Sequence, residues 1–532
     1  MLNTQADLAE CCKKVGDLMS CSLLYEDRVQ FIEYAEDTLF SDLHLDEIIA
    51  AVTVDLPGYD LGSIYRQKPL RVDDVLFRQA IVRDFYSSQL TDILDRFIQG
   101  LNLAKRYLNY RDRSAGCQQA AKWHLDSARI YCDSVECLAT SLTDCCCQDY
   151  SLGVRRFSAW LEDYAGSPDF ERLHTRVSTL AESMNSCRFA LEVDIGNQSV
   201  AIDLDTDRMS YMDDLTVDFA RYDLRDLRRE TVAFADAQMN VLENQIWSVL
   251  GEDYPSIFAQ LTQFRQDYPS FIEPHLLEFE REYMFYHSFL IFSRRLVNKG
   301  LPFSVPSLQE AQMICIHDGF DIALALKIDP GDLVLNDLII SADEHTLLLT
   351  GPNQGGKTTF SRMLGQTFFL ASLGLPVPCR DAAIFPVNGI QTHFVKQETA
   401  GSLSGRLQDE LLRLRQILMS SQKGCLIILN ELFSSATTDD ACEMARRVMK
   451  LLRKMNCLCL YVTHVHELAE HDLDTVTLVA GVSDSYPQHC TYRMMRSCVR
   501  DNASAQRLLQ KYHLTRIEIE VRKNASDTVV RR

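Results

Sequence analysis

The chain has 532 residues, of which 46% are hydrophobic and 24% are charged, and its formal net charge is −20. These proportions are ordinary for folded proteins and exclude a globally disordered or low-complexity chain. The length predicts three to four domains. No run of about 18 uninterrupted apolar residues is present, so no membrane span is predicted. The negative net charge excludes a uniformly basic coat, and a polyanionic partner would need a local basic patch.

The 18 cysteines are predicted to be free thiols, because the first residues carry no secretion-signal pattern. This favours a reducing, cytoplasmic location. The cysteine clusters at residues 11–12 and 145–147 lack the spacing of zinc ligands, and no histidine follows at ligand distance. We therefore interpret these thiols as buried or incidental rather than as metal ligands.

The first 150 residues are predicted to be mainly helical. The run from Leu94 to Thr143 contains no proline, and its apolar residues recur at helical spacing, which predicts extended helices. After Cys187, two strand-like runs flank Gly196–Asn197 and predict a β-hairpin. Helical periodicity returns from Leu215 to Val297, with predicted breaks at residues 253–255 and 267–269, each of which reads Asp-Tyr-Pro.

The periodicity of the sequence changes after residues 301–308. These residues contain two prolines and are predicted to form a linker. Strand-like segments then alternate with helical stretches, at residues 345–349, 425–429 and 457–462. This alternation predicts a mainly parallel sheet with helices on its faces. The tail, from residue 491 to residue 532, is predicted to be helical and is basic.

The strongest chemical signal is the segment GPNQGGKT, residues 351–358, which lies between a strand-like run and a helical run. It fits the pattern G-x-x-x-x-G-K-[ST], whose glycines let backbone N–H groups surround a phosphate. Lys357 is placed to reach the β- and γ-phosphates, and the Thr358 hydroxyl is placed to bind Mg²⁺. The alternative is a glycine-rich turn that merely starts a helix. The predicted nucleotide-binding residues are Gly351, Pro352, Asn353, Gln354, Gly355, Gly356, Lys357, Thr358 and Thr359.

Two further strand-like runs end in polar residues. The run CLIIL ends at Asn430 and Glu431, where P-loop ATPases place an acidic residue that reaches Mg²⁺ and often a Glu that positions water. Asn430 can still bind a metal-bound water, and Glu431 is the candidate base. The run CLCLYV leads to His464, which is predicted to contact the nucleotide. The alternatives are a helix-capping pair and an ordinary hydrogen-bonding histidine.

Four segments occur in a characteristic order: GPNQGGKTTF, the segment at residues 397–411 with RLQDEL, then NELFSSATTDDA, and finally VTHVHEL. Together they resemble the MutS family of ABC-type ATPases over about residues 330–485. By itself, the segment at residues 397–411 is explained equally well as a helix N-cap. The resemblance extends loosely to FSDLHLDEI, to FRQAIVRDF, to the long helices and to REYMFYHSFLIFSRRL.

The resemblance implies a homodimer with two composite sites that bind ATP and Mg²⁺. One subunit would supply Glu431 and His464 as catalytic residues, and Thr358 and Asn430 at the metal. The partner would supply a signature segment to the γ-phosphate, made up of Ser402, Ser404, Gly405 and Arg406.

The implied fold is an α-helical core and lever region with a small mixed α/β clamp subdomain, followed by a P-loop α/β ATPase domain of the ABC type. The expected bounds are 1–115 for the core, 116–300 for the levers with the clamp at about 150–270, 301–490 for the ATPase and 491–532 for the tail.

Three departures from the family pattern shape the predicted function. Asn430 replaces the usual acidic residue, which predicts slow hydrolysis. A form that lacks the N-terminal mismatch-reading domain is expected, so branched or structured DNA is the expected target rather than mispairs. Residues 151–230 hold 10 Arg and no Lys against 16 acidic residues, which does not support DNA contact there. The prediction is a dimeric ATPase that clamps DNA. The alternative is an ATP-gated interaction protein that acts on structured RNA, a ribosome or a protein, with slow or vestigial hydrolysis.

Overall fold

The computed structural model forms two compact units, one made of Met1–Arg83 with Arg281–Arg532 and the other of Asp84–Glu280. They are named here the sheet unit and the helical unit. The described residues are 22–26, 32–33, 37–54, 56, 58–68, 71–114, 116–145, 149–187, 190–194, 199–203, 241–395, 403–464, 468, 475–482 and 489–496.

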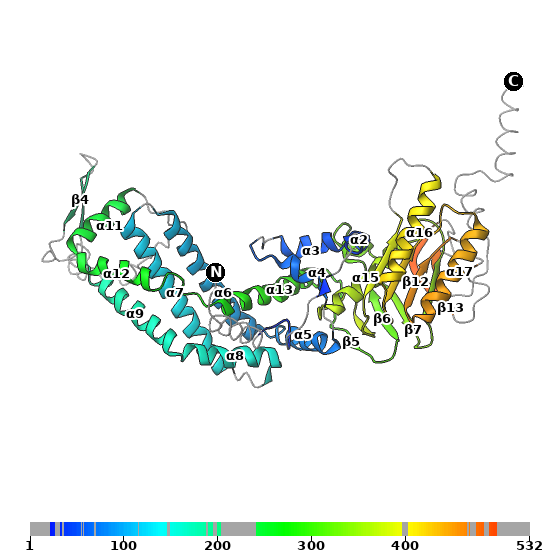
Figure 1. The fold of residues 1–532 in the computed structure, drawn as a ribbon, viewed down its shortest axis with the longest axis horizontal. Coiled ribbons are helices and arrows are strands. Elements are labelled where there is room, and N and C mark those ends of the chain that lie inside the picture. The colour runs from blue at the N-terminus through cyan, green and yellow to red at the C-terminus, as the bar shows by residue number, and fades with distance from the viewer. Residues whose placement is uncertain are drawn as a thin grey trace, which may run out of the picture. The chain divides into compact units, whose positions relative to one another are not determined.

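The helical unit is built around two long helices, α6 (Ser88–Arg113) and α7 (Cys117–Asp144), which pack against each other (Figure 1). This confirms the predicted extended helices, and Gly116 marks the break between them. Among the described residues of this unit, four shorter helices follow, together with the first part of α13 (Pro274–Val297). They are α8 (Leu152–Ala165), α9 (Pro168–Asn185), α11 (Val241–Asp253) and α12 (Pro255–Asp267). The ends of α11 and α12 confirm the two predicted breaks.

A hairpin follows α9, as the sequence predicts. Strands β3 (Ala190–Asp194) and β4 (Ser199–Asp203) pair antiparallel, and the expected turn at Gly196–Asn197 lies outside the described residues.

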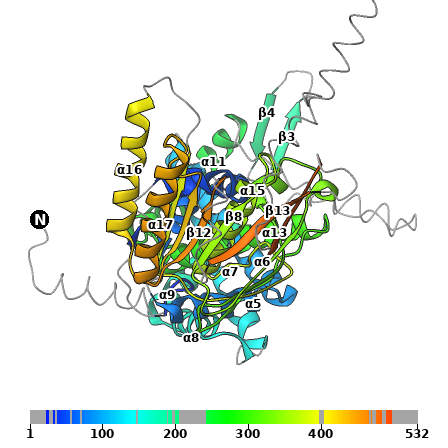
Figure 2. The same cartoon turned by 90° about the vertical axis from the view of Figure 1, so that its right-hand side faces the viewer.

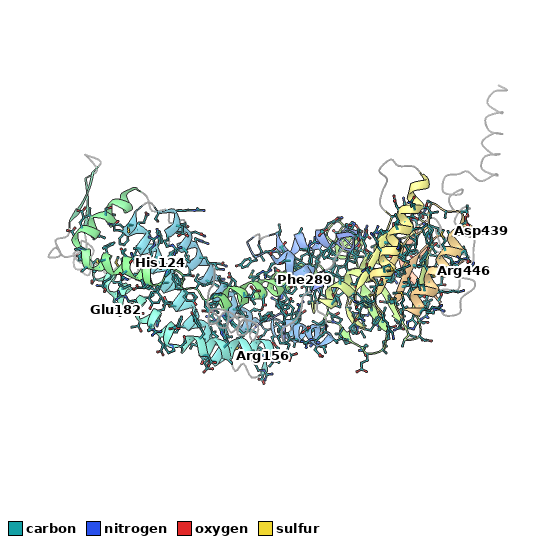
Figure 3. The ribbon with its side chains drawn as sticks, viewed as in Figure 1. His124, Arg156, Glu182, Phe289, Asp439 and Arg446 are labelled. Carbon is teal, nitrogen blue, oxygen red and sulfur yellow. The ribbon has the colours of Figure 1, made fainter. Side chains whose placement is uncertain are left out.

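The helical unit also contains a fully buried histidine, His124, labelled in Figure 3. Its Nε2 donates to the Tyr268 carbonyl at 2.9 Å, and its Nδ1 accepts from Arg111 at 3.0 Å. Burial lowers the pKa of His124 to about 4, so the imidazole is neutral at physiological pH. These contacts identify His124 as a structural residue that ties α7 to the segment after α12.

The larger sheet of the sheet unit has six strands in the order β10-β11-β12-β8-β13-β14. The first four pairings are parallel and the last, between β13 and β14, is antiparallel. The bounds are β8 Thr346–Thr350, β10 Ile390–Phe394, β11 Leu426–Asn430, β12 Leu458–Val462, β13 Thr475–Val482 and β14 Cys490–Arg496. Every residue of β8, β11 and β12 is buried, as continuous apolar runs require in a sheet covered on both faces.

Helices cover both faces of this six-stranded sheet. Helices α16 (Leu403–Ser420) and α17 (Thr438–Lys454) share one hydrophobic core with strand residues such as Ile427 and Cys459 (Figure 2). Helix α15 (Lys357–Ser372) lies on the other face, where Gly365 packs close to Ile428. The predicted parallel arrangement with helices on both faces therefore holds for this sheet.

A second sheet, which the sequence did not indicate, has four strands in the order β5-β9-β6-β7 and mixed pairing. Its strands are β5 (Ser307–Leu308), β6 (Ile314–Gly319), β7 (Asn336–Ile340) and β9 (Asp381–Ile384), with α14 (Ile322–Ala325) and a 3₁₀ turn (Pro330–Asp332) between β6 and β7. The predicted linker at 301–308 thus includes a short strand. The Asn336 amide joins the two sheets, because its Nδ2 donates to the Tyr492 carbonyl at 3.1 Å and its Oδ1 accepts from the Met494 N–H at 2.7 Å.

The prediction of a helical tail from residue 491 is wrong for residues 491–496. These residues belong to β14, because pairing with β13 recruits them as the last strand of the sheet. The rest of the tail lies outside the described residues.

Among the described residues, the sheet unit also includes four short helices from the front of the chain: α2 (Asp37–Asp42), α3 (Leu45–Thr53), α4 (Leu61–Arg66) and α5 (Val72–Asp84). A two-stranded ladder, β1 (Ile32–Glu33) with β2 (Gln67–Lys68), accompanies them. The Asp42 carboxylate accepts from Arg413 at 2.6 Å and from the Thr392 hydroxyl at 2.9 Å, which ties α2 to α16 and β10.

Within the part of the chain that the structure describes, no helix combines the length and apolar character needed to cross a membrane. The same residues contain no cluster of three or more His, Cys, Asp or Glu side chains that could hold a metal ion. The described cysteines are free, whereas the clusters at residues 11–12 and 146–147 lie outside the described residues.

Candidate functional site

The predicted phosphate-binding loop connects β8 to α15, which confirms the strand–loop–helix context. Gly351 and Gly356 have φ values of 133° and 86°, which side-chain-bearing residues rarely adopt. A Cβ atom on Gly351 would lie 2.7 Å from the Ala480 Cβ, so β13 approaches the loop too closely for any side chain there. The loop backbone can therefore curve tightly at the start of α15, where free N–H groups favour an anion.

Lys357 is the first residue of α15 and is only 5% exposed. Its ammonium group donates to the carbonyl oxygens of Gly351 and Pro352, each at 3.0 Å. Burial lowers the pKa of Lys357, and the nearby Glu431 carboxylate opposes that shift. The two carbonyls thus hold the cation beneath the loop, within reach of a bound anion.

A cavity of about 500 Å³ opens beside this loop. One wall is polar and includes residues 353–359 of the loop together with Glu431. The other wall comes from the segment between β6 and β7, from α15 and from β14, and combines apolar side chains with the polar residues Asp321, Asp332 and Asn336. Its side chains include Phe320, Leu324, Ile328, Leu333, Val334, Met363 and Tyr492. No local pattern in the sequence marks these wall residues, because only the fold brings them to the loop.

Asn430 ends β11 next to Thr358 at the start of α15. The Asn430 Nδ2 lies 3.4 Å from the Thr358 Oγ1, so the structure brings together the two residues predicted to bind a metal. Asn430 is 6% exposed, and its Oδ1 is buried without a hydrogen-bond partner among the described residues. The buried Asn430 Oδ1 and the Thr358 hydroxyl are both oxygen atoms of the kind that Mg²⁺, or a water bound to it, prefers.

Glu431 lines the cavity and forms a hydrogen-bonded pair with His464. The distance between His464 Nε2 and Glu431 Oε1 is 2.9 Å, although the two residues are 33 positions apart. The hydrogen bond from His464 lowers the pKa of Glu431, and the charge of Lys357 adds to this effect, whereas partial burial opposes it. Glu431 is therefore a carboxylate at neutral pH, ready to accept a proton.

Comparison with known proteins agrees with this geometry. Residues 347–507 match the profile described as MutS domain V. A similar segment of 167 residues in the DNA mismatch repair protein MutS of Shouchella clausii is 28% identical, and covers 31% of this chain and 19% of that relative. This part of the chain is thus similar to the MutS family.

Two further relatives align over segments of 144 and 145 residues. The DNA mismatch repair protein msh3 of Botryotinia fuckeliana is 34% identical over 144 residues, which cover 26% of this chain and 13% of the relative. The DNA mismatch repair protein MutS of Rickettsia felis is 34% identical over 145 residues, which cover 27% of this chain and 16% of that relative. In these alignments the chain spans about a fifth or less of the length of its relatives.

The segment that matches MutS domain V also contains the start of α16, where the signature segment was predicted. Ser402 lies outside the described residues. Ser404, Gly405 and Arg406 lie in the first turn of α16, where the backbone alone is described. Their predicted contact with a nucleotide therefore stays a prediction.

Proposed function

We propose that this chain is a MutS-like ATPase that binds ATP and Mg²⁺ in the 500 Å³ cavity and hydrolyses ATP to ADP and phosphate. The observation that carries the proposal is the position of Lys357 and Glu431 on the same cavity, with His464 hydrogen-bonded to Glu431. The cavity volume lies within the range of about 300–1,000 Å³ that is usual for small-molecule sites.

The two walls of the cavity suit the two ends of ATP. The loop from Gly351 to Thr359 offers N–H groups and the Lys357 ammonium to the phosphates. The other wall offers Leu333, Val334 and Tyr492 to the purine base, which is flat and largely apolar. A polyphosphate without a base would use the first wall alone.

Thr358 and Asn430 are the residues that would hold Mg²⁺, whose charge offsets the negative charge of the β- and γ-phosphates. The Thr358 hydroxyl and the buried Asn430 Oδ1 offer oxygen atoms of the kind that Mg²⁺ prefers. Because Asn430 brings no negative charge, we expect weaker metal binding and slower turnover than an aspartate would give.

Glu431 accepts the proton of the attacking water in this proposal, and His464 holds the Glu431 carboxylate in the required orientation. The hydrogen bond from His464 keeps Glu431 ionised. Both side chains remain partly exposed, so water can reach them.

The similarity to the MutS family supports a homodimer with composite sites, in which Ser402, Ser404, Gly405 and Arg406 of each chain reach the partner's nucleotide. It also supports the assignment of core, lever and clamp regions at residues 1–115 and 116–300, ahead of an ATPase of the P-loop, ABC type at 301–490. DNA is the proposed target because the matched relatives are DNA mismatch repair proteins. Branched or structured DNA is preferred over mispairs in this proposal.

The decisive experiment measures ATP binding, ATP hydrolysis and DNA binding on the same preparations. Lys357→Ala should abolish ATP binding, because the buried cation under the loop is lost. Glu431→Gln should retain binding and lower hydrolysis by about 10²–10⁴-fold, the usual contribution of a general base. Unchanged ATP affinity in Lys357→Ala would refute the nucleotide site. A panel of duplex, junction and single-stranded DNA, with and without ATP at low salt, tests the DNA target.

A second candidate function keeps the ATPase and replaces DNA by a protein or structured RNA. The acidic composition of residues 151–230, 16 acidic residues against 10 Arg and no Lys, favours it. The Glu431→Gln chain, held in its ATP-bound form, should then capture nuclease-resistant partners from lysate. A sharp rise in hydrolysis in Asn430→Asp would indicate that the wild-type chain is tuned for slow turnover.

A further inference from the structure

Glu410 is a buried carboxylate on α16 that the proposed hydrolysis does not use directly. It is 7% exposed, and its Oε2 accepts a hydrogen bond from the backbone N–H of Phe433 at 3.0 Å. Phe433 follows Glu431 by two positions. This hydrogen bond therefore joins α16 to the loop that carries the candidate base.

The loop from Asn430 to Phe433 holds a backbone conformation that its own residues do not favour. Glu431 has φ 57° and Phe433 has φ 64°, and neither residue is glycine. Left-handed residues of this kind persist only where surrounding contacts hold them. The loop lies between the end of β11 and α17, so those contacts must come from other elements.

Three backbone groups in this loop are held by such contacts. The Glu431 N–H donates to the Val462 carbonyl at 3.0 Å. The Leu432 carbonyl accepts from the Tyr461 hydroxyl at 3.3 Å. Both of these partners lie on β12, the strand next to β11. The third contact, from Glu410 to Phe433, comes from a helix and involves the only carboxylate among the three partners.

We propose that Glu410 is a positioning residue for Glu431, a role that rests on the ATPase function proposed above. The carboxylate fixes the Phe433 N–H, and Leu432 is 4% exposed, so the short backbone between Glu431 and Phe433 has no freedom to rearrange. Glu410 thereby sets the direction in which Glu431 leaves the loop, towards the cavity and His464.

The position of Glu410 on α16 gives two routes by which it can affect the reaction. Helix α16 begins at the signature segment, which is proposed to act on the partner's nucleotide, and its middle contacts the Glu431 loop of its own chain. The hydrogen bond to Phe433 assigns the effect to the site of the same chain.

The first test compares two substitutions of Glu410 by steady-state kinetics and ATP titration. Glu410→Asp shortens the side chain by one methylene, so the carboxylate no longer reaches Phe433, whereas Glu410→Gln keeps an acceptor oxygen at the same length. We expect Glu410→Asp to lower kcat at least about tenfold with ATP affinity within about twofold of wild type, and Glu410→Gln to stay within about threefold. Asp409→Asn is the matched control, because Asp409 is the neighbouring, exposed carboxylate on α16.

The second test uses mixed dimers in which Lys357→Ala inactivates one chosen site. Pairing a Glu410→Asp chain with a Lys357→Ala chain leaves the altered chain's own cavity active, and its turnover should be slow. Pairing a Glu410→Asp, Lys357→Ala chain with a wild-type chain leaves the wild-type cavity active, and its turnover should be normal. Equal rates in the two pairings, or the reverse order, would overturn the proposal.

Outcomes of the first test decide the proposal in the same way. Wild-type kcat in Glu410→Asp, or a loss in Glu410→Gln as large as in Glu410→Asp, contradicts a hydrogen-bond role. Absence of hydrolysis in the wild-type chain contradicts the proposed function instead. In that case crystal structures still test the positioning: the φ values of Glu431 and Phe433 should leave the left-handed region in Glu410→Asp and remain there in Glu410→Gln.

Discussion

Two loops meet at the candidate site, and both use left-handed backbone conformations. In the loop after β8, these conformations fall on Gly351 and Gly356, with Gln354 between them. In the loop after β11, they fall on Glu431 and Phe433, neither of which is glycine. The first loop takes its shape largely from its own residue types. The second takes its shape from contacts with β12 and with α16.

This difference determines which substitutions should damage each loop. A loop shaped by glycine is damaged by a substitution within it, because an added side chain meets both strain and a close neighbour. A loop shaped by distant contacts is damaged by substitutions that are far away in the sequence. Ligand affinity should therefore depend on local changes in the first loop, and turnover on remote changes around the second.

The largest effect is expected from the substitution Gly351→Ala, which distorts the first loop. In Gly351→Ala, the new Cβ would lie 2.7 Å from the Ala480 Cβ and 3.0 Å from the Ala480 nitrogen, at a φ of 133°. We expect ATP affinity to fall at least about tenfold and the free energy of unfolding to fall by about 1–3 kcal/mol. Isothermal titration with ATP and urea denaturation measure the two quantities.

Two controls accompany Gly351→Ala. Gly62→Ala, in α4, places a Cβ with no atom within 4 Å, and should leave the protein as stable or slightly more stable. The double variant Gly351→Ala, Ala480→Gly should recover part of the loss, because the nearest clash is removed while the φ strain remains. ATP affinity in Gly351→Ala equal to that in Gly62→Ala would show that the loop does not need its glycine.

The next effect concerns pH and tests the second loop. The hydrogen bond from His464 holds the pKa of Glu431 below its ordinary value. Glu431 therefore stays ionised and can accept a proton until the pH falls through that lowered pKa. In His464→Ala the pKa of Glu431 rises towards its ordinary value. The acid limb of the kcat profile should therefore move to higher pH.

His464→Gln provides the control for this pH effect, since the glutamine amide can still donate to Glu431. Its acid limb should lie between those of the wild type and His464→Ala. An acid limb in His464→Ala that stays in place, or that moves to lower pH, would exclude Glu431 as the base coupled to His464.

A smaller effect is expected at Tyr461, which supports the second loop from β12. Tyr461 is 1% exposed, and its hydroxyl donates to the Leu432 carbonyl at 3.3 Å. Tyr461→Phe should lower the free energy of unfolding by about 1 kcal/mol, because the buried carbonyl loses its donor. Urea denaturation gives this difference. Tyr492→Phe, at a tyrosine that is 49% exposed, should change stability by less than about 0.5 kcal/mol.

The smallest effect on stability is expected at Gln354, which has a left-handed conformation in the first loop although it is not a glycine. Gln354 is exposed and has φ 62°. Gln354→Gly relieves backbone strain of about 1 kcal/mol, and the greater freedom of glycine in the unfolded chain offsets most of this gain. Thermal unfolding should therefore show a change within about 0.5 kcal/mol. A clear loss of stability would mean that the glutamine side chain itself holds the loop.

The predictability of the site follows the same division between local and distant causes. The strand, glycine loop and helix around Lys357 could be predicted because consecutive residues carry the whole pattern. Asn430, Glu431 and His464 could be placed at strand ends because parallel strands present their carboxyl ends at one edge of a sheet. The hydrogen bond of 2.9 Å between Glu431 and His464 agrees with that expectation.

Other features could not be predicted, since they depend on pairings across long stretches of sequence. Strand β14 was expected to be helical, and only its antiparallel pairing with β13 makes it a strand. The wall with Leu333 and Tyr492 forms where two sheets approach each other, and no periodicity marks such a junction. Glu410 looks like an ordinary helix residue in the sequence, and its hydrogen bond to Phe433 appears only in the folded chain.

The Asn336 amide has a consequence for the colloidal behaviour of the protein. Strand β7 is the last strand of the four-stranded sheet, and β14 is the last strand of the six-stranded sheet. Exposed outer strands of this kind can template pairing with other molecules and so promote aggregation. The Asn336 side chain donates to the Tyr492 carbonyl and accepts from the Met494 N–H, and it thereby links the two outer strands. At this point the β7 side chain therefore occupies two backbone groups of β14 that could otherwise pair with another molecule.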